Sequence, residues 1–446
     1  MARRAAALAT ALAALFLIAA AAVGPPPTRA GYARDERQCD GYPRAPIDMI
    51  SGLCAGIVVA PPPEGLRPSK RKIRLPRTLL ALPDGDLLVV DLGSWEPGHG
   101  SVWRLTPHRG GEPRLAKLLE KLDLPHTIAV GPDGRIYVGE MNRIRRFDPD
   151  AADPQASLET VVAGLPGNRL HANRHPLSSF IFDADGGLLV NVGAPTDQCA
   201  PEPGETRCAE ADGDGRRVHA AIWRFAYQGH GQWDGAYTVF ASGLRNSLAM
   251  VRTGGGALLQ AENSIDVADR FWPPEELNVL AKGGKYGWPY CVGMGEAAPA
   301  WRGTAGVDCH AYRDPVLLLP PHGAPLSLVE YHGAMFPQLE GRLLVSLHGY
   351  RATGSRILAL ELDDKGVPVA SAKAAYEVYA ASGRPVRRAY GPGPATNGLV
   401  LTPGWNALAG RRPAGSPVGM AITADGAIWV AEDRNGAILR LARDRH

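Results

Sequence analysis

Three polar stretches of the sequence combine residue types that can carry chemistry. His175 stands directly before an expected strand, and histidine is the side chain whose ordinary pKa suits a base at neutral pH. Arg245 and Asn246 stand together at the entrance of another expected strand, where a guanidinium beside an amide can bind an anion. Residues 261–278 are rich in side-chain oxygens, which suits a hard cation such as Ca²⁺. On residue type alone, a structural histidine, a surface arginine and a turn with solvated acids also explain these stretches.

Composition and absent motifs weaken several functional classes. The 446 residues carry 48 Lys and Arg against 45 Asp and Glu, a net charge of +3 without a basic stripe, so a nucleic-acid partner is not expected. The sequence has no GxGxxG motif after a strand, no P-loop, no HExxH motif, no GxSxG elbow and no EF-hand loop. These absences weaken the nicotinamide, nucleotide, metalloprotease and serine-hydrolase classes without excluding them.

A short unit that recurs along the chain must position the polar stretches. Each copy has a turn with glycine followed by an apolar run, and Asp-Gly between apolar runs is the strongest short-range signal of a β-hairpin. The turn glycines are Gly85, Gly134, Gly186, Gly255, Gly341 and Gly426, with weaker copies at Gly255 and Gly341. A second strand follows most copies, at residues 101–105, 143–147, 221–225, 356–360 and 437–441.

Six such units predict an all-β fold, a six-bladed β-propeller with long rim loops, because radial repetition protects the edges of its sheets. A β-sandwich with extra strands is the alternative. We expect residues 76–446 to form the propeller and residues 31–75 to form an N-terminal extension against it. The long rim segments are 193–219, 261–290 and 373–417, and propellers concentrate their chemistry in such loops on one face.

The first 30 residues have the pattern of a secretory signal peptide. Arg3 and Arg4 precede an apolar stretch that ends near Val23, prolines follow it, and cleavage is expected after Ala30. An uncleaved membrane anchor is the alternative, because an apolar stretch of this length nearly spans a bilayer. We favour cleavage, and therefore expect a secreted or periplasmic protein without stable membrane insertion.

Six cysteines in an exported chain suggest disulfide bonds. Their clustering suggests the local pairs Cys39–Cys54, Cys199–Cys208 and Cys291–Cys309, although six cysteines allow about 15 connectivities. No CxxC spacing is present, which disfavours zinc, and no CxxCH motif for haem attachment is present.

The polar stretches, in this order on the Asp-Gly repeats, resemble the glucose/sorbosone dehydrogenase family of six-bladed propellers. The resemblance runs roughly from Leu75 to Leu441. Its most specific parts are Gly-Leu-Arg-Asn at residues 243–246 and Glu-Leu-Asn followed by Gly-Gly-x-Tyr-Gly-Trp-Pro within residues 276–289. The early blades look closer to the sorbosone-like branch than to soluble glucose dehydrogenase. The family uses pyrroloquinoline quinone (PQQ) and calcium.

The resemblance implies a role for each polar stretch. His175 falls where the family has its general base, which takes the proton of a substrate hydroxyl while hydride passes to the quinone. Arg245 and Asn246 match the pair beside the cofactor, where a guanidinium offsets the charge that grows on the reduced quinone. Ser264 and Ile265 occupy the places whose backbone carbonyls bind calcium against the cofactor.

Two histidines complete the implied cofactor site, and two positions depart from the family pattern. His322 and His348 lie on later rim loops that face the same site. His348 stands where soluble glucose dehydrogenase has a lysine, and Ser416 stands where the family often has an arginine. The nearby Arg411 and Arg412 are offset by several positions. Two positive contacts to a tricarboxylated cofactor are therefore missing or displaced, which bears on cofactor affinity.

Together these features predict an exported oxidoreductase that depends on PQQ and Ca²⁺ and oxidises a sugar, a polyol or a related aldehyde. Electrons are expected to pass to a separate acceptor, because the chain has no haem motif of its own. Two other classes stay open. A metal-dependent lactonase would use residues such as Glu262, Asn263 and Asp425 around a central ion, and a non-catalytic propeller would bind glycan or protein.

Overall fold

The computed structural model describes residues 37–60, 72–166, 173–213, 217–269, 272–349, 354–369, 399–405 and 415–444. The expected signal peptide, the displaced Arg411 and Arg412 and most of the rim segment 373–417 lie outside the described residues. Within the described part of the chain, no helix is long and apolar enough to cross a membrane.

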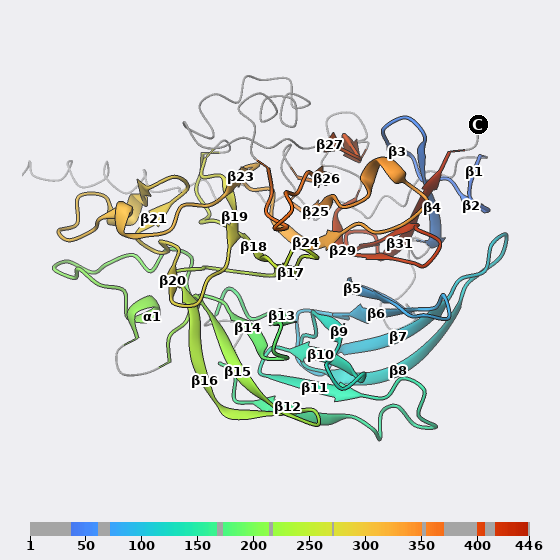
Figure 1. Ribbon diagram of the computed structural model, residues 1–446, viewed down its shortest axis with the longest axis horizontal. Helices are drawn as coiled ribbons and strands as arrows, with labels where there is room; N and C mark the ends of the chain where they lie inside the picture. Colours follow the sequence, from blue (N-terminus) through green and yellow to red (C-terminus); the bar gives the residue numbers. More distant parts are fainter. Residues whose placement is uncertain are drawn as a thin grey trace, which may run out of the picture. The chain divides into compact units, whose positions relative to one another are not determined.

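In the described part of the chain, six of the sheets are blades with four antiparallel strands each (Figure 1). Blade 1 contains β5 (Pro76–Ala81), β6 (Leu87–Asp91), β7 (Gly100–Thr106) and β8 (Arg114–Leu122). Blade 2 contains β9 (Ile128–Val130), β10 (Ile136–Glu140), β11 (Arg143–Phe147) and β12 (Glu159–Ala163). Blade 3 contains β13 (Phe180–Phe182), β14 (Leu188–Val192), β15 (Ala221–Gly229) and β16 (Gln232–Ser242).

The other three blades repeat this plan. Blade 4 contains β17 (Ala249–Arg252), β18 (Leu258–Glu262), β19 (Glu275–Val279) and β23 (Leu317–Leu319). Blade 5 contains β24 (Pro325–Glu330), β25 (Leu343–Leu347), β26 (Arg356–Leu360) and β27 (Leu399–Val400). Blade 6 contains β29 (Pro417–Ile422), β30 (Ile428–Glu432), β31 (Ala437–Arg443) and, from the other end of the chain, β4 (Leu53–Val59).

The blades form a propeller ring, in which the first strands of neighbouring blades contact one another, as β5 does with β9 and β29. The predicted six-bladed propeller is therefore confirmed, and the sandwich alternative is wrong. The second strands of five blades are buried along their whole length, and that of blade 4 is buried except for its first residue, because both of their faces pack against a neighbouring blade. Leu88 and Val138, for example, share one buried cluster between blades 1 and 2. The hydrophobic core thus lies between blades.

The predicted glycine turns join the first and second strand of each blade. Their glycines have positive φ, a left-handed conformation that glycine adopts without a steric cost: Gly85, Gly134, Gly186, Gly341 and Gly426. The fourth copy needs a correction, because Gly256 rather than Gly255 has the positive φ there. The sequence reads Gly254-Gly255-Gly256, and composition alone does not distinguish which of three glycines takes the left-handed position.

The expectation that residues 31–75 form an extension needs correction for β4. This strand pairs with β31, with Ile57 opposite Leu439, and so completes blade 6 (Figure 1, blue beside red). The two ends of the chain thereby close the ring. Before β4, the chain forms β1 (Gln38–Cys39), which pairs with β2 (Tyr42–Pro43), and β3 (Ile47–Asp48), which pairs with β28 (Gly404–Trp405).

Insertions in blades 3 and 4 form the long rim loops. The β14–β15 loop contains the short helix α1 (Ala209–Asp212), and the β19–β23 insertion contains the short elements β20 (Gly284–Lys285), β21 (Cys291–Val292), β22 (Glu296–Ala297), η2 (Pro299–Trp301) and η3 (Cys309–Ala311). Blade 5 adds η4 (Pro337–Leu339) between β24 and β25. The two insertions pack together, since Tyr290 and Trp301 share a buried cluster with Cys208.

All three local disulfide pairs are confirmed. The structure joins Cys39 to Cys54, Cys199 to Cys208 and Cys291 to Cys309. The first ties β1 to the closing strand β4, and the other two lie in the insertions of blades 3 and 4.

Candidate active site

Apolar side chains from all six blades meet in one cluster at the centre of the ring. The cluster contains Leu92, Leu124, Met141, Leu177, Leu248, Leu326 and Val418. Most of them lie near the start of a first strand or just after the end of a second strand. Because the first and second strands of a blade are antiparallel, these two positions lie at the same end of the central channel. His175, Asn246 and Ser416 each stand two residues before a member of this cluster, so they lie at the mouth on that face.

His175 is buried, and its environment keeps the ring neutral. The Nδ1 atom lies 2.6 Å from the carbonyl oxygen of Ala194, which can only accept, so Nδ1 carries the proton. Burial, followed by the nearby Arg245 charge, lowers the pKa of His175 to about 3. The Nε2 atom therefore holds the lone pair, and it has no hydrogen-bond partner among the described residues. A neutral imidazole with a free lone pair is suited to accept a proton.

Gly193 allows the close packing behind His175. A Cβ atom at residue 193 would lie 2.7 Å from the Cβ atom of His175 and 2.8 Å from its carbonyl oxygen. The absence of a side chain at this position is thus part of what positions the imidazole.

Arg245 lies beside His175, because the N–H group of Ala194 donates to the carbonyl oxygen of Arg245 at 2.8 Å. The Arg245 side chain is also buried and forms an ion pair with Asp197, 2.5 Å from Nη2 to Oδ1. Its Nη1 donates to the carbonyl oxygen of Asn263 at 2.8 Å. The sequence analysis did not single out Asp197, which lies in the β14–β15 loop without a motif around it.

Two buried polar atoms at the mouth lack partners among the described residues. They are Oδ1 of Asn246 and Oγ of Ser416. The backbone around them is held, since Asn246 N donates to Glu262 Oε1 at 3.1 Å and Ser416 N donates to Glu432 Oε1 at 2.9 Å. Buried polar atoms are nearly always hydrogen-bonded, so these two orphans fit a polar ligand at this mouth, one with a hydrogen-bond donor for Oδ1 of Asn246.

The predicted calcium residues lie in the β18–β19 loop next to this mouth. Ser264 N donates to Glu275 Oε2 at 2.6 Å, and the same carboxylate accepts from Ala324 N at 2.9 Å, which ties the loop to blade 5. The Ile265 side chain is buried among the aromatic residues of the insertions. In the part of the chain that the structure describes, neither carbonyl oxygen of these two residues accepts a hydrogen bond. Both are therefore available as cation ligands.

Three buried glutamates support this loop. Burial raises the pKa of Glu262 to about 7, and burial raises the pKa values of Glu275 and Glu276 to about 8. Glu262 and Glu276 lie opposite each other in the β18–β19 pair. No group of three or more His, Cys, Asp or Glu residues suited to hold a metal ion is found among the described residues. A cation here would depend on backbone carbonyls and on the ligand itself.

The two later histidines are both hydrogen-bonded. His322, in the left-handed region with φ of 56°, has Nε2 at 2.7 Å from the carbonyl oxygen of Asp269 and 3.1 Å from that of Trp272. It thus braces the β18–β19 loop. His348 has Nε2 at 2.9 Å from Asp433 Oδ1.

His348 belongs to a second polar cluster, which the sequence analysis missed. Asp433 forms a 2.7 Å ion pair with Arg77, whose Nε lies 3.2 Å from Nδ1 of His126. Burial, and then the Arg77 charge, lower the pKa of His126 well below its usual value. The sequence did contain a signal for them. Arg77 and His126 each directly follow a proline shortly before or at the start of a first strand, as Leu177 does in blade 3. Aligning the repeats at this position would have found both residues.

The lactonase residues do not come together. Glu262 ends the second strand of blade 4, whereas Asp425 lies in a turn between a first and a second strand and pairs with Arg440 at 2.6 Å. These two kinds of connection lie at opposite ends of a blade. The structure therefore gives no support to a metal site built from Glu262, Asn263 and Asp425.

The six-bladed fold is shared with solved structures of sugar-oxidising and carbohydrate-active enzymes. The PQQ domain of pyranose dehydrogenase from Coprinopsis cinerea, in its holo form, is 20% identical and has a TM-score of 0.63 over 91% of this chain and 100% of that chain. The calcium structure of the Trichoderma reesei carbohydrate-active enzyme of family AA12 is 19% identical, with a TM-score of 0.63 over 90% and 98% of the two chains. PQQ-bound aldose sugar dehydrogenase from Streptomyces coelicolor is 18% identical, with a TM-score of 0.52 over 89% and 100%.

The chain belongs to the family described as TrAA12-like, which its sequence matches over residues 67–444. The resemblance to PQQ-dependent glucose/sorbosone-type sugar dehydrogenases is thereby confirmed. No curated protein matches the sequence significantly. The roles of the individual site residues stay predictions, since the structural likenesses are below 25% identity and show the fold.

Proposed function

We propose that this protein is an exported oxidoreductase that oxidises a sugar, a polyol or a related aldehyde with PQQ and Ca²⁺ and passes the electrons to a separate acceptor. The observation that carries the proposal is the neutral, buried His175 beside the buried Arg245 at the channel mouth. Membership of the TrAA12-like family and the sugar dehydrogenases among the solved structures support the reaction class.

The residues at the mouth fit a tricarboxylated quinone. Arg245 offers positive charge, and Oδ1 of Asn246 and Oγ of Ser416 offer unpaired polar atoms. Arg77 places a second buried guanidinium beside His348, at the face where the lysine and arginine of the family pattern are missing. When bound, the quinone supplies the two-electron acceptor that the oxidation requires.

His175 supplies the base for the substrate hydroxyl. Its Nδ1–H group stays bonded to Ala194, and its Nε2 atom would take the proton of the substrate hydroxyl, with the bound quinone as the hydride acceptor. Arg245, which is fixed beside His175, would stabilise the negative charge that develops on the reduced quinone. We propose calcium at the carbonyl oxygens of Ser264 and Ile265, and the calcium structure of the Trichoderma reesei relative supports a cation in this fold.

Titration of the metal-stripped mature protein with PQQ, with and without Ca²⁺, tests the proposal by cofactor absorbance. We expect saturable, calcium-dependent binding near one equivalent, followed by dye reduction when sugars and polyols are screened with an artificial electron acceptor. Absence of binding at micromolar PQQ contradicts the proposal and favours a non-catalytic propeller that binds glycan or protein. Ester hydrolysis without quinone would instead favour the lactonase.

A further inference from the structure

Asp197 accepts hydrogen bonds from two nitrogens of the Arg245 guanidinium with two different groups. Its carboxylate Oδ1 lies 2.5 Å from Nη2, and its carbonyl oxygen accepts from Nε at 3.1 Å. Together with the Asn263 carbonyl on Nη1, these contacts fix the plane of the guanidinium as well as its position. A planar fork held at three nitrogens has little freedom to rotate.

Asp197 is also the buried counter-ion of Arg245. The side chains of Arg245 and Asp197 are 5% and 13% exposed, whereas Asp266, 3.6 Å from the same Nη2, is 71% exposed. Burial by itself raises the pKa of the Asp197 carboxyl, but the Arg245 charge and hydrogen bonds that it accepts lower the pKa overall. Asp197 is therefore ionised at neutral pH, and a buried arginine requires such a partner.

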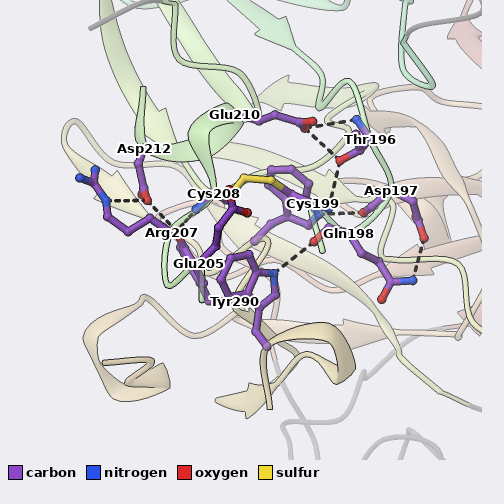
Figure 2. The surroundings of a disulfide bond; sticks show 12 residues. Thr196, Asp197, Gln198, Cys199, Glu205, Arg207, Cys208, Glu210, Asp212 and Tyr290 are labelled. Carbon is purple, nitrogen blue, oxygen red and sulfur yellow. Dashed lines mark hydrogen bonds and ion pairs between the residues drawn. A yellow bond between two sulfur atoms is a disulfide. The ribbon is translucent and has the colours of Figure 1, made fainter. Parts of the chain in front are cut away.

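The loop that carries Asp197 is fixed from its other side by the Cys199–Cys208 disulfide (Figure 2). Thr196 bonds to Glu210 through both its N–H and its hydroxyl group, at 3.2 and 3.0 Å. The N–H group of Cys199 donates to the Thr196 hydroxyl at 3.0 Å. The residues on both sides of Asp197 and Gln198 are thus anchored.

The blade 4 insertion covers the same loop. Trp301 Nε1 donates to the carbonyl oxygen of Gln198 at 3.2 Å, and Trp288 Nε1 donates to that of Asp197 at 3.0 Å. Cys208 N donates to the hydroxyl group of Tyr290 at 2.8 Å. The Asp197 carbonyl therefore has its two acceptor positions occupied by Trp288 and Arg245, so the loop and the guanidinium share one rigid arrangement.

We propose that Asp197 is a positioning residue, which holds the Arg245 guanidinium at the channel mouth beside His175, and that the loop closed by Cys199–Cys208 keeps it in place. This deepens the proposed function and rests on it, because it assigns Arg245 to the quinone. The charge balance agrees: the Arg245 charge lowers the pKa of His175, and the Asp197 charge opposes that effect.

The test compares Asp197→Asn with Asp212→Asn as a matched control. Asp212 lies in α1, directly after the segment that the disulfide closes, and it accepts from Tyr290 and Arg207 and not from Arg245. The first measurement is solvent exchange of the Arg245 Nε proton in the apoprotein by NMR with ¹⁵N-labelled arginine. We expect exchange at least about tenfold faster in Asp197→Asn and unchanged in Asp212→Asn.

The second measurement is the dissociation constant of PQQ in the presence of Ca²⁺. We expect about tenfold weaker binding in Asp197→Asn, since misplaced groups around a site typically cost this much. Unchanged exchange of the Arg245 Nε proton in Asp197→Asn overturns the proposal, because Asp197 would then not hold the guanidinium. Unchanged or tighter PQQ binding overturns it as well, because Asp197 would then act on Arg245 only through its charge. A wild-type protein that binds no PQQ contradicts the proposed function, while faster Arg245 exchange would still support the positioning role.

A double variant, Cys199→Ser with Cys208→Ser, keeps the proposal testable if Asp197→Asn does not fold. It retains Asp197 but frees the loop. We expect faster Arg245 Nε exchange in this variant as well, and exchange equal to that of the wild type would contradict a role of the disulfide loop.

Discussion

At the scale of single residues, the chemistry depends on where protons and charges are held. One backbone carbonyl, that of Ala194, fixes the tautomer of His175, and burial keeps the ring neutral. Arg245 stands on the other side of Ala194 with its charge balanced by Asp197. The pair thus combines an uncharged base with a fixed cation, although both groups are buried and both contact the backbone of Ala194.

Replacing His175 with asparagine should abolish turnover and leave the cofactor bound. A positioned general base contributes about 10²- to 10⁴-fold, so kcat should fall by at least about 100-fold while the PQQ dissociation constant changes little. Dye-coupled kinetics and absorbance titration measure the two quantities. His310→Asn, at an exposed histidine in η3, is the control and should keep both values. Full activity in His175→Asn would show that another group is the base.

His175 should also make the protein less stable as the pH falls. Its pKa is about 3 in the folded state and about 6.5 in an unfolded chain, so the unfolded state takes up the proton first. The contribution of His175 to the free energy of unfolding is therefore fully present above about pH 6.5 and is lost as the pH falls from there toward about 3.

The expected size is about 1.4 kcal/mol of unfolding free energy between pH 7.5 and pH 5.5. His175→Gln lacks this loss, so denaturant titrations at both pH values should show the variant gaining about that amount relative to the wild type. A difference between the two proteins that is the same at both pH values would contradict the low pKa.

At the scale of elements, each blade begins with a hairpin whose turn needs a left-handed glycine. Gly85 and Gly426 occupy the same turn position in blades 1 and 6, with φ of 90° and 81°. Their surroundings differ, because a Cβ at Gly85 meets nothing within 4 Å, whereas one at Gly426 would lie 2.6 Å from the backbone nitrogen of Met335.

The two glycines therefore form a matched pair for substitution. Gly85→Ala should cost about 1 to 2 kcal/mol from the left-handed backbone alone. Gly426→Ala should cost about 2 kcal/mol more, because the backbone of blade 5 must also shift. Urea unfolding of both variants measures the difference, and equal losses would show that the Met335 segment yields freely.

The regular elements are the part that the sequence predicts well. Strands β11 and β26 match the expected ranges 143–147 and 356–360 because each alternates or runs apolar between clear turns. The rim insertions are different. Nothing in residues 193–219 marked Asp197 as the partner of Arg245, since that contact joins residues 48 positions apart.

At the scale of the whole molecule, closing the ring joins the two ends of the chain. Strand β4 lies against β31, and Arg440 reaches across from β31 to Asp40 at 2.8 Å. The Cys39–Cys54 disulfide holds the segment before β4 to the closing strand. A propeller whose last blade mixes both termini can open only if this pairing breaks.

Removing the disulfide with Cys39→Ser and Cys54→Ser should lower the unfolding free energy by about 3 kcal/mol, since the bond closes a loop of about 15 residues in the unfolded chain. Guanidinium unfolding measures the loss. In hydrogen exchange, the amides of β4 and β31 should lose more protection than those of β10, which lies in blade 2. Equal exchange in all three strands, together with unchanged stability, would contradict a closing role.

The sequence by itself determined the repeat, the six blades and the family, and it suggested the local disulfides, because these depend on patterns among residues that are close in the sequence. It also placed His175, Arg245 and Asn246 at blade entrances. Only the tertiary structure decided which distant groups meet: Asp197 pairs with Arg245, and Arg77, His126, His348 and Asp433 come together from four different blades. The addition of β4 to blade 6 is of the same kind, since a short apolar strand does not specify its partner until the ring is closed. Local pattern fixes the blades, and packing around the ring fixes the site.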